Sequence, residues 1–139
     1  MTSRGIRLFN PGNIDHNPNS IWDGEIVPSE DSRFCTFNNF SYGCRALLKV
    51  LRTYVEKHGL KTVREIINRW APPSENNTDS YVMHVASAAG VDADTEIPFD
   101  VDPSYYLAIG KAIARHENGA DAELIPNDAW EEAYKLAGL

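Results

Sequence analysis

A run of apolar residues at helical spacing between Tyr42 and His58 constrains the fold of this chain more than any other feature. Charged residues separate the apolar positions, and Gly59 ends the run. The apolar positions are Leu47, Val50, Leu51, Tyr54 and Val55. Apolar residues with this period form one face of an amphipathic helix, and other elements have to cover that face. The sequence therefore predicts a long helix in a packed domain.

The remaining patterns predict four further helices and one small β element. The helices are expected over Lys61–Trp70, Asp79–Ala89 with Thr78 as its N-cap, Pro103–Gly119 and Asn127–Ala137. Two short strands, Ile21–Val27 and Arg33–Phe37, are expected to form a hairpin through turn-forming residues 28–32. This content predicts an α+β domain that is mainly α, with about five helices around a central buried helix.

Length and composition limit the classes of protein and partner. The 139 residues suffice for a single domain spanning residues 1–139, and 42% hydrophobic with 24% charged residues is typical of a soluble globular protein. No stretch resembles a transmembrane span, and the N-terminus lacks a signal-peptide core, so we expect cytoplasmic synthesis and no membrane insertion. The net charge of −7 disfavours a nucleic-acid partner bound through its phosphates.

The cysteines and histidines show no metal-binding pattern. Cys35 and Cys44 are the only cysteines, and without a secretory signal they are expected to be reduced core thiols. The four histidines are scattered and form neither an HExxH motif nor a Cys–His spacing. A P-loop, a dinucleotide-binding fingerprint and a GxSxG motif are also missing from the sequence. We therefore expect no metal and no cofactor.

The helix expected over Pro103–Gly119 carries a glutamate at its end. Asp102 suits the N-cap, and Gly119 supplies the left-handed residue that commonly ends a helix. An apolar row along this helix leads to Glu117 at a spacing of four residues. The row consists of Tyr105, Ile109 and Ile113. Partial burial and the negative potential of a helix C-terminus both disfavour a charged carboxyl group, so Glu117 is expected to keep its proton near neutral pH.

A carboxylic acid that stays protonated suits glycosidic bond cleavage, because the leaving oxygen must receive a proton. We therefore take Glu117 as the candidate general acid, and the alternative is a helix-end glutamate that lies in solvent beside Asn118. If the reaction needs a second carboxylate, the candidates are Glu25, Glu30 and Asp31, in or beside the hairpin. Their alternative is a solvated loop without chemistry.

Several polar and aromatic residues are candidate substrate contacts. Trp22 and Trp70 could stack on sugar faces, although aromatic residues beside regular elements more often fill a core. Glu75 lies in a stiff loop, where it could line a cleft or act as a first-turn helix charge. Asn10 and Asn13 could bind substrate amides or simply form the Asn-Pro-Gly-Asn turn.

Recognisable motifs are spread along the chain almost as far as Gly119. They are residues 4–7, residues 10–14, Trp22 and Gly24, Phe34 and Phe37, residues 43–47 and 58–63, the Arg-Trp-Ala-Pro-Pro block within residues 67–78, residues 81–82 and residues 116–119. With these motifs the chain resembles the small phage-encoded murein lysins of the lysozyme-like superfamily, which are often labelled virion structural proteins. The resemblance implies a lysozyme-like fold and peptidoglycan as the substrate.

A second likeness concerns the helix that carries Glu117. Residues 112–119 look like the helix end with the catalytic glutamate in lytic transglycosylases, and residues 68–82 look like their later loop and following helix. In those enzymes the glutamate helix comes first, so the likeness implies a circularly permuted fold with Glu117 beside the Asn10–Ile14 turn. It also implies substrate contacts from Asn76, Tyr81 and Asn118.

The resemblance thus implies a peptidoglycan-degrading glycosidase, either a lytic transglycosylase or a muramidase. It would cleave the β-1,4 bond between N-acetylmuramic acid and N-acetylglucosamine, with Glu117 as general acid and base. The expected partners are peptidoglycan glycan strands and other virion proteins, and the expected place of action is the periplasm or cell wall. Two alternatives stay open: a non-catalytic virion structural or peptidoglycan-binding protein, and a murein endopeptidase.

Overall fold

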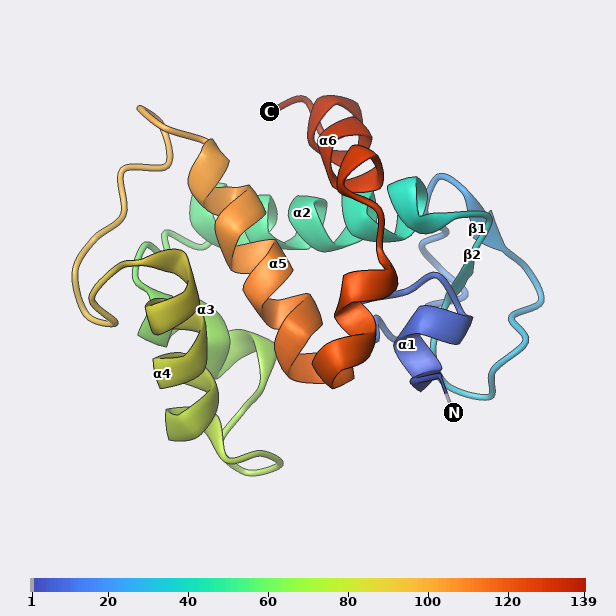
Figure 1. The fold of residues 1–139 in the computed structure, drawn as a ribbon, viewed down its shortest axis with the longest axis horizontal. Coiled ribbons are helices and arrows are strands. Elements are labelled where there is room, and N and C mark those ends of the chain that lie inside the picture. The colour runs from blue at the N-terminus through green and yellow to red at the C-terminus, as the bar shows by residue number, and fades with distance from the viewer. Residues whose placement is uncertain (1) are drawn as a thin grey trace.

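The structure is a computed structural model, and it describes residues 2–139. Helices dominate these residues, and a two-stranded sheet lies near the N-terminal end (Figure 1). In chain order the elements are α1 (Arg4–Arg7), β1 (Glu25–Ile26), β2 (Thr36–Phe37), α2 (Phe40–Glu56), α3 (Val63–Trp70), α4 (Thr78–Ala89), α5 (Ser104–Asn118), the 3-10 helix η1 (Gly119–Leu124) and α6 (Asn127–Leu136). The predicted α+β class with mainly helical content is confirmed.

The long helix α2 forms the support on which the other helices pack. α5 crosses it and α6 lies against it, while α3 and α4 lie toward its C-terminal end (Figure 1). Its Leu47, Leu48 and Leu51 are almost fully buried, as the apolar periodicity requires. Near its start, a Cβ atom on Gly43 would lie 1.7 Å from the Phe9 carbonyl oxygen, so only glycine permits this approach.

Two predicted helix caps are wrong by one residue. Asn77 caps α4, because its side chain accepts a hydrogen bond from the Ser80 backbone N–H, whereas Thr78 lies inside the helix and donates to the Ala71 carbonyl at 2.6 Å. Pro103 is the residue before α5, and the predicted cap Asp102 accepts from the Ser104 N–H. The Asp102 carboxylate therefore still satisfies a donor of the first turn.

The N-terminal region differs most from the prediction. The strands Ile21–Val27 and Arg33–Phe37 shrink to two residues each, in the register Glu25 opposite Phe37, and the short helix α1 was not predicted. Side-chain hydrogen bonds organise the intervening segment instead: the Ser29 hydroxyl lies 2.6 Å from the Phe34 carbonyl and 2.9 Å from the Thr36 hydroxyl. Side chains that hydrogen-bond to nearby groups in this way take the place of the inter-strand hydrogen bonds that longer strands would make.

The core has a main cluster among the helices and a small cluster beneath the sheet. The small cluster consists of Cys35, Phe37 and Ala46, with Ile14, Trp22 and Tyr42 packed against it. Among residues 2–139, no helix has the length and apolar character needed to cross a membrane.

Candidate functional site

The end of α5 lies beside the turn at residues 10–14, although about 100 residues separate them in sequence. The Asn13 amide N–H donates to Glu117 Oε1 at 3.0 Å, and the Asn118 amide donates to the Pro11 carbonyl at 2.8 Å. Figure 1 shows the neighbouring α1 next to this end of α5. The predicted position of Glu117 next to the turn is therefore present in the structure.

The local backbone explains how the turn reaches Glu117. Asn13 adopts a left-handed conformation with φ 51°, which asparagine tolerates better than most residues. Gly5 in α1 leaves room for it, since a Cβ atom there would lie 2.7 Å from Asn13 Oδ1 and 2.6 Å from Asn118 Oδ1. A glycine at this position therefore lets the turn and α5 meet.

Tyr81 of α4 holds the second oxygen of the glutamate. Its hydroxyl donates to Glu117 Oε2 at 2.8 Å, and its side chain is almost fully buried. Burial, and then the nearby Glu117, raises the pKa of Tyr81 far above its usual value, so the phenol stays a donor. The Tyr81 ring also stacks on His116, with the ring centroids 3.7 Å apart.

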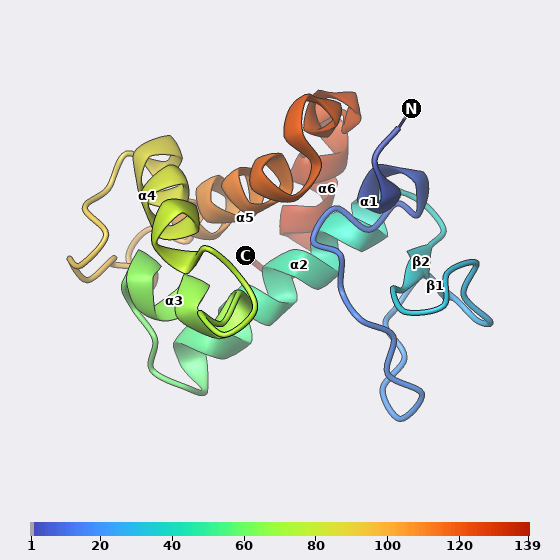
Figure 2. The ribbon, with the colours of Figure 1, turned by 90° about the horizontal axis from the view of Figure 1, so that it is seen from below.

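Glu117 opens into a groove with a volume of about 580 Å³. The lining comes from the segment between α1 and β2, from α2, and from the α3–α4 connection, which lie near one another in Figure 2. The lining residues are Gly12, Asn13, Ile14, Asp15, Arg33, Phe34, Val50, Tyr54, Trp70, Ala71, Glu75, Asn76 and Glu117. A groove of this size accommodates a ligand of several rings.

Five predicted site residues line this groove: Asn13, Trp70, Glu75, Asn76 and Glu117. Trp70 is partly exposed, and its ring lies against Gly12 and edge-on to Tyr54. An indole held in this way offers a rigid apolar surface with little loss of conformational freedom. Tyr81 does not line the groove and instead acts on it through Glu117.

Two predicted substrate contacts, Asn10 and Asn118, need correction. Asn10 has no exposed surface, and its amide donates to the carbonyls of Ile14 and Cys35 at 3.0 and 2.9 Å. Asn118 is 7% exposed and donates to the carbonyls of Pro11 and Ala114. These two side-chain amides link the turn to neighbouring backbone segments. Their N–H groups already donate to backbone carbonyls and are therefore not available to a substrate.

Trp22 and Glu25 also lie outside the groove. Trp22 packs against the small core cluster. The Glu25 side chain has no exposed surface, lies 2.7 Å from His16 Nδ1, and accepts a hydrogen bond from the Trp22 backbone N–H. The prediction that Glu25 serves as a second catalytic carboxylate is therefore corrected, because a buried, bonded carboxylate cannot reach a ligand in the groove.

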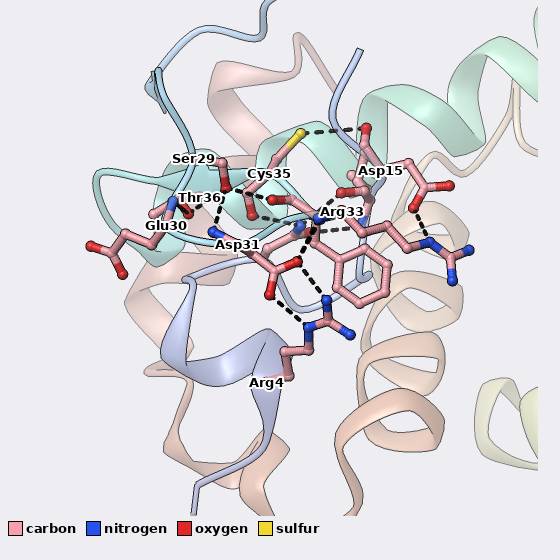
Figure 3. Close-up of polar contacts among 11 residues, drawn as sticks. Arg4, Asp15, Ser29, Glu30, Asp31, Arg33, Cys35 and Thr36 are labelled. Atoms are coloured by element: carbon pink, nitrogen blue, oxygen red, sulfur yellow. Dashed lines mark hydrogen bonds and ion pairs between the residues drawn. The ribbon is translucent and has the colours of Figure 1, made fainter.

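Glu30 and Asp31 belong to a separate polar network (Figure 3). The two Asp31 oxygens accept from the Arg4 guanidinium at 2.8 and 2.6 Å, and one of them accepts from the Phe34 N–H. The Arg4 hydrogen bonds lower the pKa of Asp31 well below its usual value. Glu30 is exposed and is not among the groove residues, so its predicted catalytic role is corrected as well.

Sequence reasoning missed an acidic and basic pair that lines the groove. Asp15 and Arg33 are both exposed, and Arg33 Nε lies 2.8 Å from Asp15 Oδ1. Asp15 follows the Asn-Pro-Gly-Asn turn by two residues, and that proximity was the available signal. Its pairing with Arg33 depends on contacts between segments that no local pattern encodes.

Three potential metal ligands also come together, although the sequence predicts no metal site. His16, Glu25 and Cys35 each place a ligand atom within 4.8 Å of the others. Cys44, the other cysteine, is fully buried in the main core. The spacing of the two cysteines therefore gave no hint of the cluster.

Comparison with known proteins identifies a phage relative. No protein-family model matches the chain. Protein P5 of Pseudoalteromonas phage PM2 is 35% identical over 121 residues, which covers 86% of this chain and 73% of that protein. An identity of this extent over most of both chains indicates common descent. The chain therefore belongs to the same protein family as Protein P5 of Pseudoalteromonas phage PM2.

Proposed function

We propose that the groove binds a peptidoglycan glycan strand and that Glu117 is the general acid that cleaves it. The observation that carries this proposal is the location of the Glu117 carboxyl group and the hydrogen bonds that orient it. It lies in an open groove, receives one hydrogen bond on each oxygen from a neutral donor, and has no ion-pair partner within residues 2–139. A carboxyl group that is held in one orientation and has no cation beside it is suited to transfer a proton to a substrate.

The proposed reaction breaks the β-1,4 bond between N-acetylmuramic acid and N-acetylglucosamine. Protonated Glu117 gives its proton to the leaving oxygen, and the resulting carboxylate then takes the proton of the muramoyl 6-hydroxyl as that oxygen attacks C1. The product is a 1,6-anhydro sugar, and no water is consumed. Asn13 and Tyr81 keep the carboxylate in place, and Trp70 offers a face for a sugar ring.

Hydrolysis is the variant that requires a second carboxylate in the groove. Asp15 and Glu75 are the two acidic groove residues besides Glu117, but Asp15 is paired with Arg33 and both are exposed. Exposed carboxylates at a groove edge are less suited to act as nucleophile or base than one held by buried donors. We therefore favour transglycosylation over hydrolysis.

The same proposal includes a lysozyme-like fold with a permuted chain order. Its support is the contact between the Asn10–Ile14 turn and Glu117, which the likeness to lytic transglycosylases implied. The relation to Protein P5 of a phage fits a protein that has to pass or open a bacterial cell wall.

A second candidate is a phage virion protein that binds peptidoglycan or other virion components without turnover. The family relationship to a phage protein supports a role in a phage, and that relationship carries no information on catalysis. In this case the groove would hold a glycan strand while Glu117 accepts hydrogen bonds from it. A murein endopeptidase remains a third reading, and product analysis separates it from the others.

The test is digestion of purified sacculi, with the soluble products identified by mass spectrometry. The proposal expects anhydro-muropeptides. Muropeptides with reducing ends would indicate a muramidase instead, and free peptides would indicate an endopeptidase. If no soluble product forms and the protein sediments with the sacculi, the protein binds peptidoglycan without cleaving it, and the enzyme proposal is wrong.

A further inference from the structure

The cluster of His16, Glu25 and Cys35 consists of residues whose sequence neighbours Asp15 and Phe34 line the groove. His16 belongs to the segment after α1, Glu25 starts β1, and Cys35 directly precedes β2. The ligand atoms lie within 4.8 Å of one another, and His16 Nδ1 is 2.7 Å from Glu25 Oε2. Residues from three separate segments therefore point toward one small volume.

Two of the three side chains in this cluster are buried. The side chains of Glu25 and Cys35 have no exposed surface, while that of His16 is 27% exposed. Glu25 lies 2.7 Å from His16 and accepts from the Trp22 backbone N–H, but no arginine or lysine forms an ion pair with it in the described part of the chain, so the buried carboxylate has no permanently charged partner there.

We propose that His16, Glu25 and Cys35 bind one divalent zinc ion. Imidazole, carboxylate and thiolate are the three ligand types that zinc accepts, whereas calcium and magnesium prefer oxygen ligands alone. The metal would replace the thiol proton of Cys35 and the hydrogen bond between His16 and Glu25. Zinc usually takes four ligands, and the partly exposed His16 marks the side on which water completes the set.

The metal would fix the groove wall made by the neighbours of its ligands. Asp15 and Phe34 line the groove, and they directly adjoin His16 and Cys35 in sequence. Backbone hydrogen bonds already join the two segments, from the His16 N–H to the Arg33 carbonyl and from the Cys35 N–H to the Ile14 carbonyl. Figure 3 shows the Cys35 sulfur directed at the Asp15 carbonyl, at the edge of this wall.

Zinc binding can be measured without any activity assay. Protein stripped with a chelator is titrated with Zn²⁺ in competition with a chromophoric chelator, for the wild type, Cys35→Ser and Cys44→Ser. We expect one equivalent bound by the wild type and by Cys44→Ser, and at least about 100-fold weaker binding by Cys35→Ser, since even outer-shell changes weaken sites by about 10- to 100-fold. Equal affinity of the Cys35 and Cys44 variants would overturn the site.

Cobalt substitution gives a readout that does not depend on how well a variant folds. Wild-type protein loaded with Co²⁺ should show a thiolate-to-cobalt charge-transfer band in the near ultraviolet, and the more exposed ligand variant His16→Asn should weaken Co²⁺ and Zn²⁺ binding alike. Thermal melting of the wild type should shift upward with added Zn²⁺. No stoichiometric binding, or Co²⁺ bound without the charge-transfer band, would leave the three side chains as a hydrogen-bonded cluster only.

Discussion

Glu117 carries one hydrogen bond on each of its carboxylate oxygens, and both donors are neutral groups from distant parts of the chain. Asn13 comes from the N-terminal turn and Tyr81 from α4. Neutral donors fix the direction of a carboxyl group without supplying a compensating charge. The orientation of this glutamate therefore depends on two residues that the helix carrying it does not contain.

Removing the Tyr81 hydroxyl should weaken both the fold and the site. A typical intramolecular hydrogen bond contributes about 0.5–1.5 kcal/mol, so we expect Tyr81→Phe to lower the free energy of unfolding by about that amount. The matched control is Tyr106→Phe, which changes another tyrosine of the main core whose hydroxyl makes no hydrogen bond to residues 2–139. Urea denaturation of both variants checks the prediction, and equal losses would contradict the role given to the Tyr81–Glu117 bond.

At the residue scale, the sequence singled out Glu117 and the resemblance placed it beside the Asn10–Ile14 turn, but neither indicated which side chains of that turn face the groove. Asn10 and Asn13 belong to the same turn motif, yet one amide is buried against Cys35 and the other faces the groove. The turn chemistry is identical for both, and only the contacts of distant segments separate them. The same reason explains why the paired Asp15 and the buried Glu25 were not distinguished in advance.

At the element scale, apolar periodicity and capping residues predicted the positions of the long helices. They did not predict the structure of the N-terminal region. α2 occupies Phe40–Glu56 where Tyr42–His58 was predicted, because its apolar stripe is long and regular. The predicted hairpin is held instead by the side chains of Ser29, Asp31 and Thr36, so its strands end after two residues. Such side-chain bonds leave no periodic signal in a sequence.

The contact between α4 and α5 should respond to acid. His84 Nδ1 and His116 Nδ1 lie 2.9 Å apart, and partial burial, followed by the neighbouring His84, lowers the pKa of His116 below its usual 6.5. The unfolded chain then binds more protons than the folded one as the pH falls below about 6.5, so stability falls in that window. We expect the free energy of unfolding to decrease between about pH 7 and pH 5.5.

The variant His116→Gln should reduce this acid sensitivity, because it removes the group that resists protonation. The exposed His58, which makes no side-chain hydrogen bond to the described residues, provides the control His58→Gln. Chemical denaturation at several pH values measures the effect. An unchanged pH dependence in His116→Gln would show that other groups cause it.

At the scale of the whole molecule, the groove is lined by segments that lie far apart in the sequence. Residues 12–15 and Glu117 line the same cavity, and the glycine at position 5 permits their close approach. The juxtaposition was expected from the likeness to lytic transglycosylases and from no property of composition or spacing. Membership of the lysozyme-like superfamily stays a prediction, whereas the relation to Protein P5 of the phage rests on sequence identity.

The net charge of −7 predicts how salt should affect the proposed binding to the anionic cell wall. Like charges repel over about 10 Å at 0.1 M salt, and added salt shortens this range. We expect binding to sacculi, measured by co-sedimentation, to strengthen as sodium chloride rises from about 0.05 to 0.3 M. Glu75→Gln, which removes one exposed groove charge, should lessen this salt dependence. Binding that weakens steadily with salt would contradict the prediction.

The central claim is that Glu117 supplies the proton for glycan cleavage, and the variant Glu117→Gln tests it most directly. The amide keeps the size of the side chain but cannot donate that proton, and co-sedimentation reports whether the groove still binds. Release of anhydro-muropeptides from sacculi is measured for wild type and variant at equal protein bound. The account predicts release by the wild type, its loss in Glu117→Gln, and binding within a few-fold of the wild type. Release by Glu117→Gln at the wild-type rate would contradict the account.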